Sequence, residues 1–100
     1  MGPCIVTASD ISDVQSLFVR SRVNEIIKQD DTTASQIFDV ATVISAISQI
    51  IALQPGTVIA TGTPSGVGYV RKPPEYLRPG DVVECEVEKI GTIKNRIKQV

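Results

Sequence analysis

The sequence predicts a mostly β fold of the α+β class, with one main helix at about residues 39–53. Apolar and polar residues alternate at 17–23 and at 82–88, which is the period of a half-buried strand. Between these stretches, valines and isoleucines recur at helical spacing, and glycine and proline punctuate the connections. One hundred residues of 42% apolar content make at most one small globular domain.

The first third of the chain predicts strands at 4–7, 17–23 and 26–29. Residues 8–16 follow no period and predict a surface loop. Asn24-Glu25 stands at a hairpin turn, although glutamate fits poorly where a positive φ is needed. Arg20 and Arg22 share one face of their strand, where they could meet an anion, but a solvated strand face is the commoner use.

Two acidic stretches are candidate cation sites. Asp30-Asp31-Thr32-Thr33 predicts a polar turn, and such side chains by default bond to nearby backbone groups. Glu84 and Glu86 share one strand face and could chelate a hard divalent cation. A solvated face close to Lys89, Lys94 and Lys98 explains the glutamates more simply. We therefore assign no metal ligand to either stretch.

The main helix is expected to begin at Asp39, a residue suited to an N-cap, and to end before Pro55-Gly56. Its apolar stripe consists of Val40, Val43, Ile44, Ile47, Ile50 and Ile51. The opposite face is small and uncharged, with Thr42, Ser45, Ala46 and Gln49. That face would suit packing against a second subunit, and an ordinary exposed face is the alternative.

The Pro-Gly pairs at 55–56 and 79–80 are typical of type II turns, and each is expected to launch a strand. The first would be the short apolar run Thr57–Ala60, and the second the alternating run 82–88. Gly91 would make the next turn, and residues 92–97 the last strand.

Residues 61–68 read TGTPSGVG and hold the best candidate for a site. Three glycines and a proline in eight positions favour neither helix nor ladder, so a loop is expected. Its backbone N–H groups can approach a ligand closely, and its hydroxyls suit a carboxylate or phosphate. Glycine-rich turns that bind nothing are common, however. The spacing matches neither a phosphate loop nor a dinucleotide fingerprint.

Composition excludes several functions. A net charge of −1 without a basic block gives no support for binding to nucleic acid or to an anionic membrane. No run is long and apolar enough to span a membrane, and no charged leader is present, so a cytoplasmic setting is expected. Histidine is absent, and Cys4 and Cys85 stand far apart, so neither a Ser-His or Cys-His nucleophile nor a zinc site is predicted.

Several short stretches follow one another in a specific order: GP-C-IVT, RVN followed five residues later by Gln29, L-x-PG-x-V-I-x-TGTPSGVG, PPEYLRPGDVVE and IGTIKNR. Over nearly all 100 residues, this order resembles the C-terminal part of the fumarylacetoacetate hydrolase family. The resemblance implies a mixed β-sandwich roll with few helices, found in homodimers. It implies residues 1–100 to be a single partial domain, the C-terminal half of a catalytic domain.

The same resemblance implies a Mg²⁺- or Mn²⁺-dependent enzyme acting on 2-oxo or β-dicarbonyl acids by C–C hydrolysis, decarboxylation or isomerisation. Family substrate contacts map onto Gly62, Thr63 and Pro64 of the TGTP loop, with the threonine hydroxyl reaching the carboxylate end. The family's Glu-x-Glu pair, Asp, Lys and His-Glu dyad lie upstream of the stretch that this chain resembles, so no catalytic or metal-binding residue is carried over. Two positions depart from the pattern: Glu25 replaces a glycine, and Gln36 replaces a methionine.

Two hypotheses follow from these observations. In the first, the chain is the C-terminal portion of such an enzyme, contributes the carboxylate loop, and needs a homodimer partner or a missing N-terminal half. The abrupt opening at Gly2-Pro3 favours it. In the second, the chain is a non-catalytic interaction or scaffold domain built on half the fold, because the metal ligands are missing. Under either hypothesis, these 100 residues alone are expected to be inactive.

Overall fold

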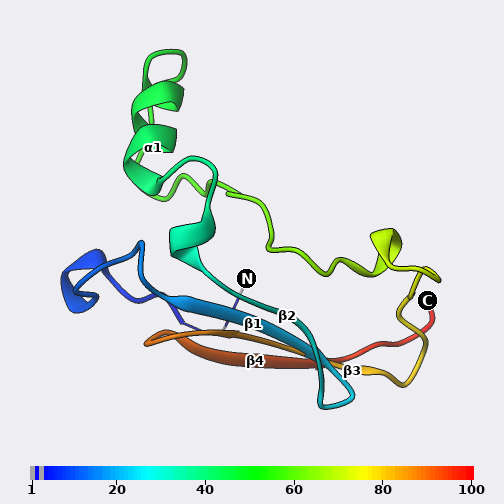
Figure 1. Cartoon of the computed structure of the whole chain (residues 1–100). Helices are drawn as coiled ribbons and strands as arrows, with labels where there is room; N and C mark the ends of the chain where they lie inside the picture. Colours follow the sequence, from blue (N-terminus) through cyan, green and yellow to red (C-terminus); the bar gives the residue numbers. More distant parts are fainter. Residues whose placement is uncertain (1, 3) are drawn as a thin grey trace.

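A four-stranded antiparallel sheet and one separate helix make up the structure, a computed structural model that describes Gly2 and residues 4–100 (Figure 1). The Met1 and Pro3 positions of the chain's opening lie outside the described residues. The strand order is β2-β1-β3-β4. The elements are β1 Phe18–Val23, β2 Ile26–Thr32, α1 Val40–Ser48, β3 Val82–Val87 and β4 Gly91–Arg96, with 3₁₀ turns at Ala8–Asp10, Thr33–Ser35 and Gly68–Val70. The mostly β architecture with one main helix is confirmed.

The β1–β2 hairpin turns at Asn24-Glu25, as predicted. Both residues have a positive φ, 50° and 69°, which is the left-handed geometry of a tight two-residue turn. Asn24 holds the turn against the start of β3, because its amide donates to Asp81 Oδ1 at 2.8 Å and accepts from the Val82 N–H at 2.9 Å. These contacts to a distant segment let Glu25 occupy an unfavourable conformation.

Residues Asp30 to Thr32 belong to β2, so the polar turn predicted at 30–33 was wrong over these positions. The pairing register places Asp30 opposite Arg20, and the guanidinium holds the carboxylate in a 3.0 Å ion pair. A cross-strand partner of opposite charge stabilises an acidic residue within a ladder. The chain leaves the sheet only at the 3₁₀ turn Thr33–Ser35.

The helix α1 starts as predicted but ends earlier. Asp39 caps it, accepting from the Thr42 N–H at 2.6 Å. The last helical residue is Ser48, so the predicted extension to residue 53 was wrong. The N–H groups of Ile50 and Ile51 both donate to Ile47 O, which closes the final turn. β-Branched residues propagate a helix weakly, and most helical stability comes from packing, which α1 lacks here.

The strands predicted at 4–7 and 57–60 are not formed in the structure. Both segments have the apolar composition of strands, but neither lies in the sheet. A strand requires a ladder of N–H and C=O bonds with a neighbouring strand, and neither segment forms such a ladder with the described residues.

The described chain buries little of its apolar surface. Among the described apolar residues, Ile11 and Leu17 alone are buried. The accessible surface is 7784 Å², whereas a compact protein of this mass exposes about 5,500 Å². The Cα radius of gyration is 15.5 Å, against about 13 Å for a compact domain of this length. The isolated chain therefore exposes about 2,300 Å² more surface than a compact protein of the same mass.

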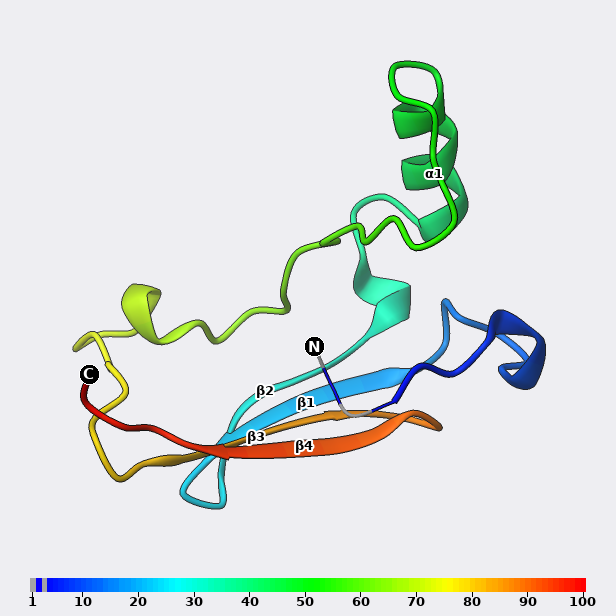
Figure 2. The same cartoon turned by 180° about the vertical axis from the view of Figure 1, so that it is seen from behind.

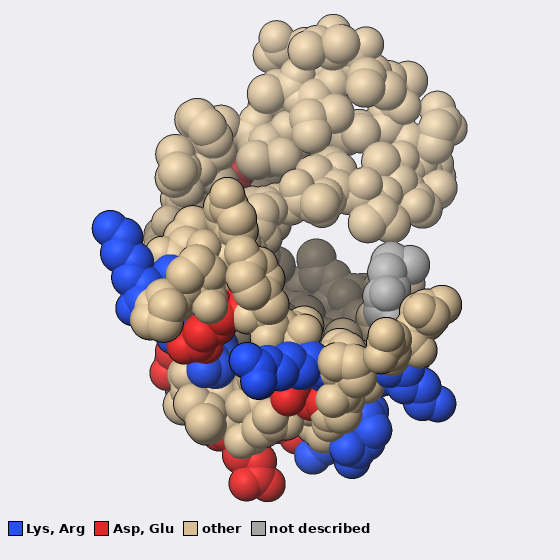
Figure 3. All heavy atoms as spheres, turned by 90° about the vertical axis from the view of Figure 1, so that its right-hand side faces the viewer, with Lys and Arg blue, Asp and Glu red and all other residues tan. Residues whose placement is uncertain are grey.

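Residues 40–70, which we call the uncharged arm, contain no Asp, Glu, Lys or Arg. Helix α1 and the following segment stand away from the sheet in both ribbon views (Figures 1 and 2). The space-filling view shows the charged side chains gathered in the lower part of the molecule, an almost uncharged upper part, and a hollow between the two (Figure 3). Within the arm, Ile50 is 86% exposed. Monomeric proteins rarely expose contiguous apolar surface of this extent.

Candidate functional site

The TGTPSGVG segment is an irregular loop, as its residue types predict. It leads from the uncharged arm into the 3₁₀ turn Gly68–Val70. Gly62 and Gly66 have φ values of 97° and 101°, a conformation in which residues with a Cβ are strained. These two glycines therefore permit the bends on either side of Thr63–Ser65.

The second half of the loop is docked on the sheet. Arg71 donates from Nε to Gly66 O at 3.0 Å and from Nη2 to Lys28 O at 2.6 Å. Gly66 lies so close to β2 that an added Cβ would collide with Lys28 O. Glu75 reinforces this junction through ion pairs with Lys28 and Arg71. The hydrogen bond from Lys28, followed by the charges of Lys28 and Arg71, lowers the pKa of Glu75.

The middle of the loop is held by one amide. Gln29 of β2 donates from Nε2 to Pro64 O at 2.7 Å and to Thr63 Oγ1 at 2.8 Å. The family motif includes Gln29, but the residue types alone gave it no role. No pattern in the sequence assigns a role to Arg71. The signal available in the sequence was weak, because a polar residue at the end of a predicted strand is ordinary.

The first half of the loop is open. Gly62 and Thr63 are exposed, and nothing lies within 4 Å of a Cβ built on Gly62. Among the bonds between described residues, the N–H groups of Gly62 and Thr63 have no acceptor. Free backbone donors beside a short hydroxyl can bind a carboxylate by charge-assisted hydrogen bonds. Gly62, Thr63 and Pro64 therefore lie together on a surface that suits a small anion, and their role in binding stays a prediction.

The acidic candidates on the sheet are engaged in ion pairs. Glu84 pairs with Lys94 at 2.7 Å, and Glu86 pairs with Arg22 at 2.8 Å. The hydrogen bond from Lys94, with the charges of Lys94 and Arg22, lowers the pKa of Glu84. The simpler interpretation is confirmed for Lys94, which pairs with Glu84, whereas Glu86 is paired by Arg22 and both glutamates are half-buried.

In the described part of the chain, no three metal-ligating side chains gather at one point. The paired carboxylates Glu84 and Glu86 would have to lose their cationic partners to bind an ion, so the residues of this chain do not fit the metal that the family resemblance implies.

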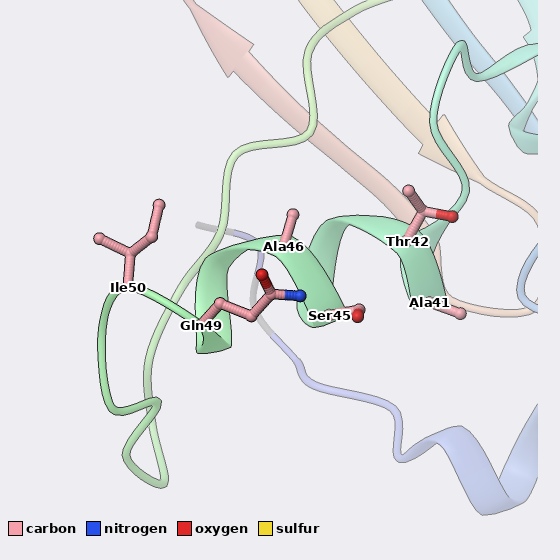
Figure 4. Close-up of a pocket in the computed structure, with 6 residues that line it drawn as sticks. All are labelled: Ala41, Thr42, Ser45, Ala46, Gln49 and Ile50. Carbon is pink, nitrogen blue, oxygen red and sulfur yellow. The ribbon is translucent and has the colours of Figure 1, made fainter.

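A hollow of about 650 Å³ runs along α1 and is lined by Ala41, Thr42, Ser45, Ala46, Gln49 and Ile50 (Figure 4). A smaller hollow of about 330 Å³ lies at the hairpin end of the sheet, next to Asn24 and Glu25. Residues 62–64 line neither of them. The hollow along α1 is bordered by one face of a single helix and by Ile50, which suits a second packed surface better than an enclosed ligand.

Comparison with known proteins agrees with the resemblance. The family described as fumarylacetoacetate (FAA) hydrolase C-terminal matches residues 1–98. The chain is 42% identical over 97 residues to the mitochondrial oxaloacetate tautomerase Fahd2a of Rattus norvegicus, covering 97% of this chain and 31% of that protein. It is 43% identical over 97 residues to the mitochondrial oxaloacetate tautomerase fahd2 of Xenopus laevis, covering 97% of this chain and 30% of the relative. The chain thus spans about a third of the length of these curated relatives. Both relatives are named as mitochondrial proteins, so the cytoplasmic location expected from the sequence is not confirmed.

Solved structures agree with the fold. The fumarylacetoacetate hydrolase from Exiguobacterium antarcticum has a TM-score of 0.94 and 41% identity, covering 99% of this chain and 35% of that one. The maleylpyruvate hydrolase from a Sphingobium strain, solved with a manganese(II) ion and pyruvate, has a TM-score of 0.88 and 33% identity, covering 98% of this chain and 34% of that one. No helix among the described residues has the length and hydropathy to cross a membrane. The chain belongs to the fumarylacetoacetate hydrolase C-terminal family.

Proposed function

We propose that the chain is one part of a metal-dependent enzyme acting on small 2-oxo acids, and that it supplies the loop that binds the substrate carboxylate. The open loop at Gly62 and Thr63 carries this proposal, because free backbone donors and a hydroxyl are held there on a docked scaffold. Mg²⁺ or Mn²⁺ and the catalytic residues would belong to parts of the protein outside these 100 residues.

The names of the relatives support the substrate class. One relative is an oxaloacetate tautomerase, and one structure is a maleylpyruvate hydrolase with pyruvate. Oxaloacetate and pyruvate each carry a carboxylate next to a carbonyl group. A loop that holds the carboxylate leaves the adjacent carbons free to react, so the same loop can serve hydrolysis, decarboxylation or isomerisation.

Replacement of Thr63 tests the site. In the full-length gene product supplied with Mn²⁺, Thr63→Val should raise the KM for oxaloacetate or an acylpyruvate by about 5- to 150-fold, the effect of losing one polar partner at about 1–3 kcal/mol. Thr63→Ser keeps the hydroxyl and should stay close to wild type. Unchanged KM and kcat in Thr63→Val would remove this loop from the site.

We further propose that the uncharged arm is covered in the full-length protein, by the rest of its own chain and by a second copy in a homodimer. The described chain as a whole exposes about 2,300 Å² more than a compact protein of its mass, an area in the range of obligate interfaces. The small residues along α1 allow close approach of another helix or sheet.

The native mass of the full-length gene product tests this arrangement. A dimer several times heavier than 10.7 kDa is expected. A stable monomer of 10.7 kDa would instead favour the non-catalytic scaffold hypothesis. The isolated 100 residues with Mn²⁺ should not turn over an acylpyruvate, and activity above the buffer rate would contradict our placement of the metal ligands.

A further inference from the structure

One half-buried amide connects the sheet to the exposed end of the loop. Gln29 lies opposite Ser21 in the β1–β2 register, and its Oε1 accepts from Ser21 Oγ at 2.9 Å. Its Nε2 reaches the other way, to Pro64 O at 2.7 Å and Thr63 Oγ1 at 2.8 Å. The two ends of the side chain therefore face two different elements.

The chemistry of the partners determines the direction of each hydrogen bond. The Pro64 carbonyl can only accept, so the NH₂ end of Gln29 faces the loop, and the Ser21 hydroxyl donates to the carbonyl end. The amide has a second N–H for Thr63 Oγ1, which must act as the acceptor. The proton of the Thr63 hydroxyl is then left for another acceptor.

We infer that Gln29 is a positioning residue that makes Thr63 a hydrogen-bond donor toward the substrate carboxylate. A free hydroxyl can present either a proton or a lone pair, whereas a carboxylate only accepts. By occupying a lone pair of Thr63, Gln29 removes the unproductive orientation, and donation into the hydroxyl strengthens the bond that the hydroxyl donates. This inference rests on the proposed function of the loop.

Pyruvate binding to the full-length protein with Mn²⁺, measured by calorimetry, tests the inference without relying on turnover. Gln29→Leu keeps the bulk and removes the donor, and should weaken binding about five- to tenfold. Gln29→Glu presents a carboxylate that accepts the Thr63 proton, so it should bind more weakly than Gln29→Leu.

A double-mutant cycle tests whether Gln29 acts by orienting the Thr63 hydroxyl or by stabilising the loop as a whole. If Gln29 acts through Thr63, Gln29→Leu should add no loss in a Thr63→Val background. Full additivity of the two losses would overturn the inference, as would wild-type affinity in Gln29→Leu.

A milder variant covers the case in which Gln29→Leu does not fold. Ser21→Ala releases the carbonyl end of the amide and should weaken pyruvate binding about two- to threefold. Ser35→Ala is the matched control, because it removes a hydroxyl bond to Asp31 on the same strand that leads to no loop residue. Equal affinity in these two variants would overturn the inference.

Wild-type protein that binds no pyruvate would overturn the proposed function and this inference together, whereas binding that is insensitive to Gln29 overturns the inference alone.

Discussion

The sheet and the uncharged arm of residues 40–70 differ in how far their polar and apolar groups find partners within the chain. In the sheet, strands pair along their length, and cross-strand ion pairs such as Arg22–Glu86 neutralise the charges. In the arm, helix α1 has no extensive contact with a strand in the described part of the chain, and large apolar side chains are exposed. Each strand of the sheet pairs with at least one neighbour, whereas the arm leaves large apolar side chains exposed. The candidate loop lies where the two regions meet.

The largest expected effect comes from placing a charge on the arm. Ala46→Arg in the full-length protein should cost about 3 kcal/mol or more, because a buried cation without a partner is poorly solvated. Urea unfolding and native mass measure the loss of stability and of assembly. Thr92→Arg, on the exposed sheet opposite Glu86, is the matched control and should stay within about 0.5 kcal/mol of wild type. Equal stability of the two variants would mean that the arm is an ordinary exposed surface.

A second comparison concerns the two glycines of the loop. Gly66→Ala should cost about 2–4 kcal/mol, since it combines a strained positive φ with a collision against Lys28 O. Gly62→Ala has the same strain but open space, and should cost about 1–2 kcal/mol. Urea unfolding of both variants gives the difference. Equal losses would show that the loop is not docked on β2.

The smallest effect is the pH dependence of the helix cap. Hydrogen bonds from the side chain and the N–H of Thr42 lower the pKa of Asp39. A depressed pKa means that the capping contribution is fully present above the ordinary carboxyl pKa and is lost as the pH falls through the lower folded-state value. Asp39→Asn caps without titrating, so the amide protection factors of residues 40–48, taken relative to the intrinsic exchange rate at each pH, should fall on acidification in wild type and stay level in the variant. The same acid response in both proteins would assign the change to another carboxylate.

Local patterns were enough to predict much of the fold. The alternation at 17–23 and 82–88, the cap at Asp39 and the turn at Asn24-Glu25 each depend on residues close together in the sequence, and each is found in the structure. The predictions that were wrong, the polar turn at 30–33, strands at 4–7 and 57–60 and a helix to 53, depend on partners elsewhere in the structure. The composition of an apolar segment is the same whether or not another strand lies beside it, so composition alone does not predict whether the segment pairs in a sheet.

The site divides in the same way. Residue types alone determined that 61–68 is a loop with free donors and short hydroxyls, because glycine and proline act on the backbone locally. Only the tertiary structure decided which half of that loop is docked and which is open, since the contacts come from Gln29 on β2 and from Arg71 beyond the loop. Such contacts depend on the pairing of β1 with β2 and on the path of the chain back across the sheet. The spacing of residues in the sequence does not show that Gln29 and Arg71 lie next to the loop.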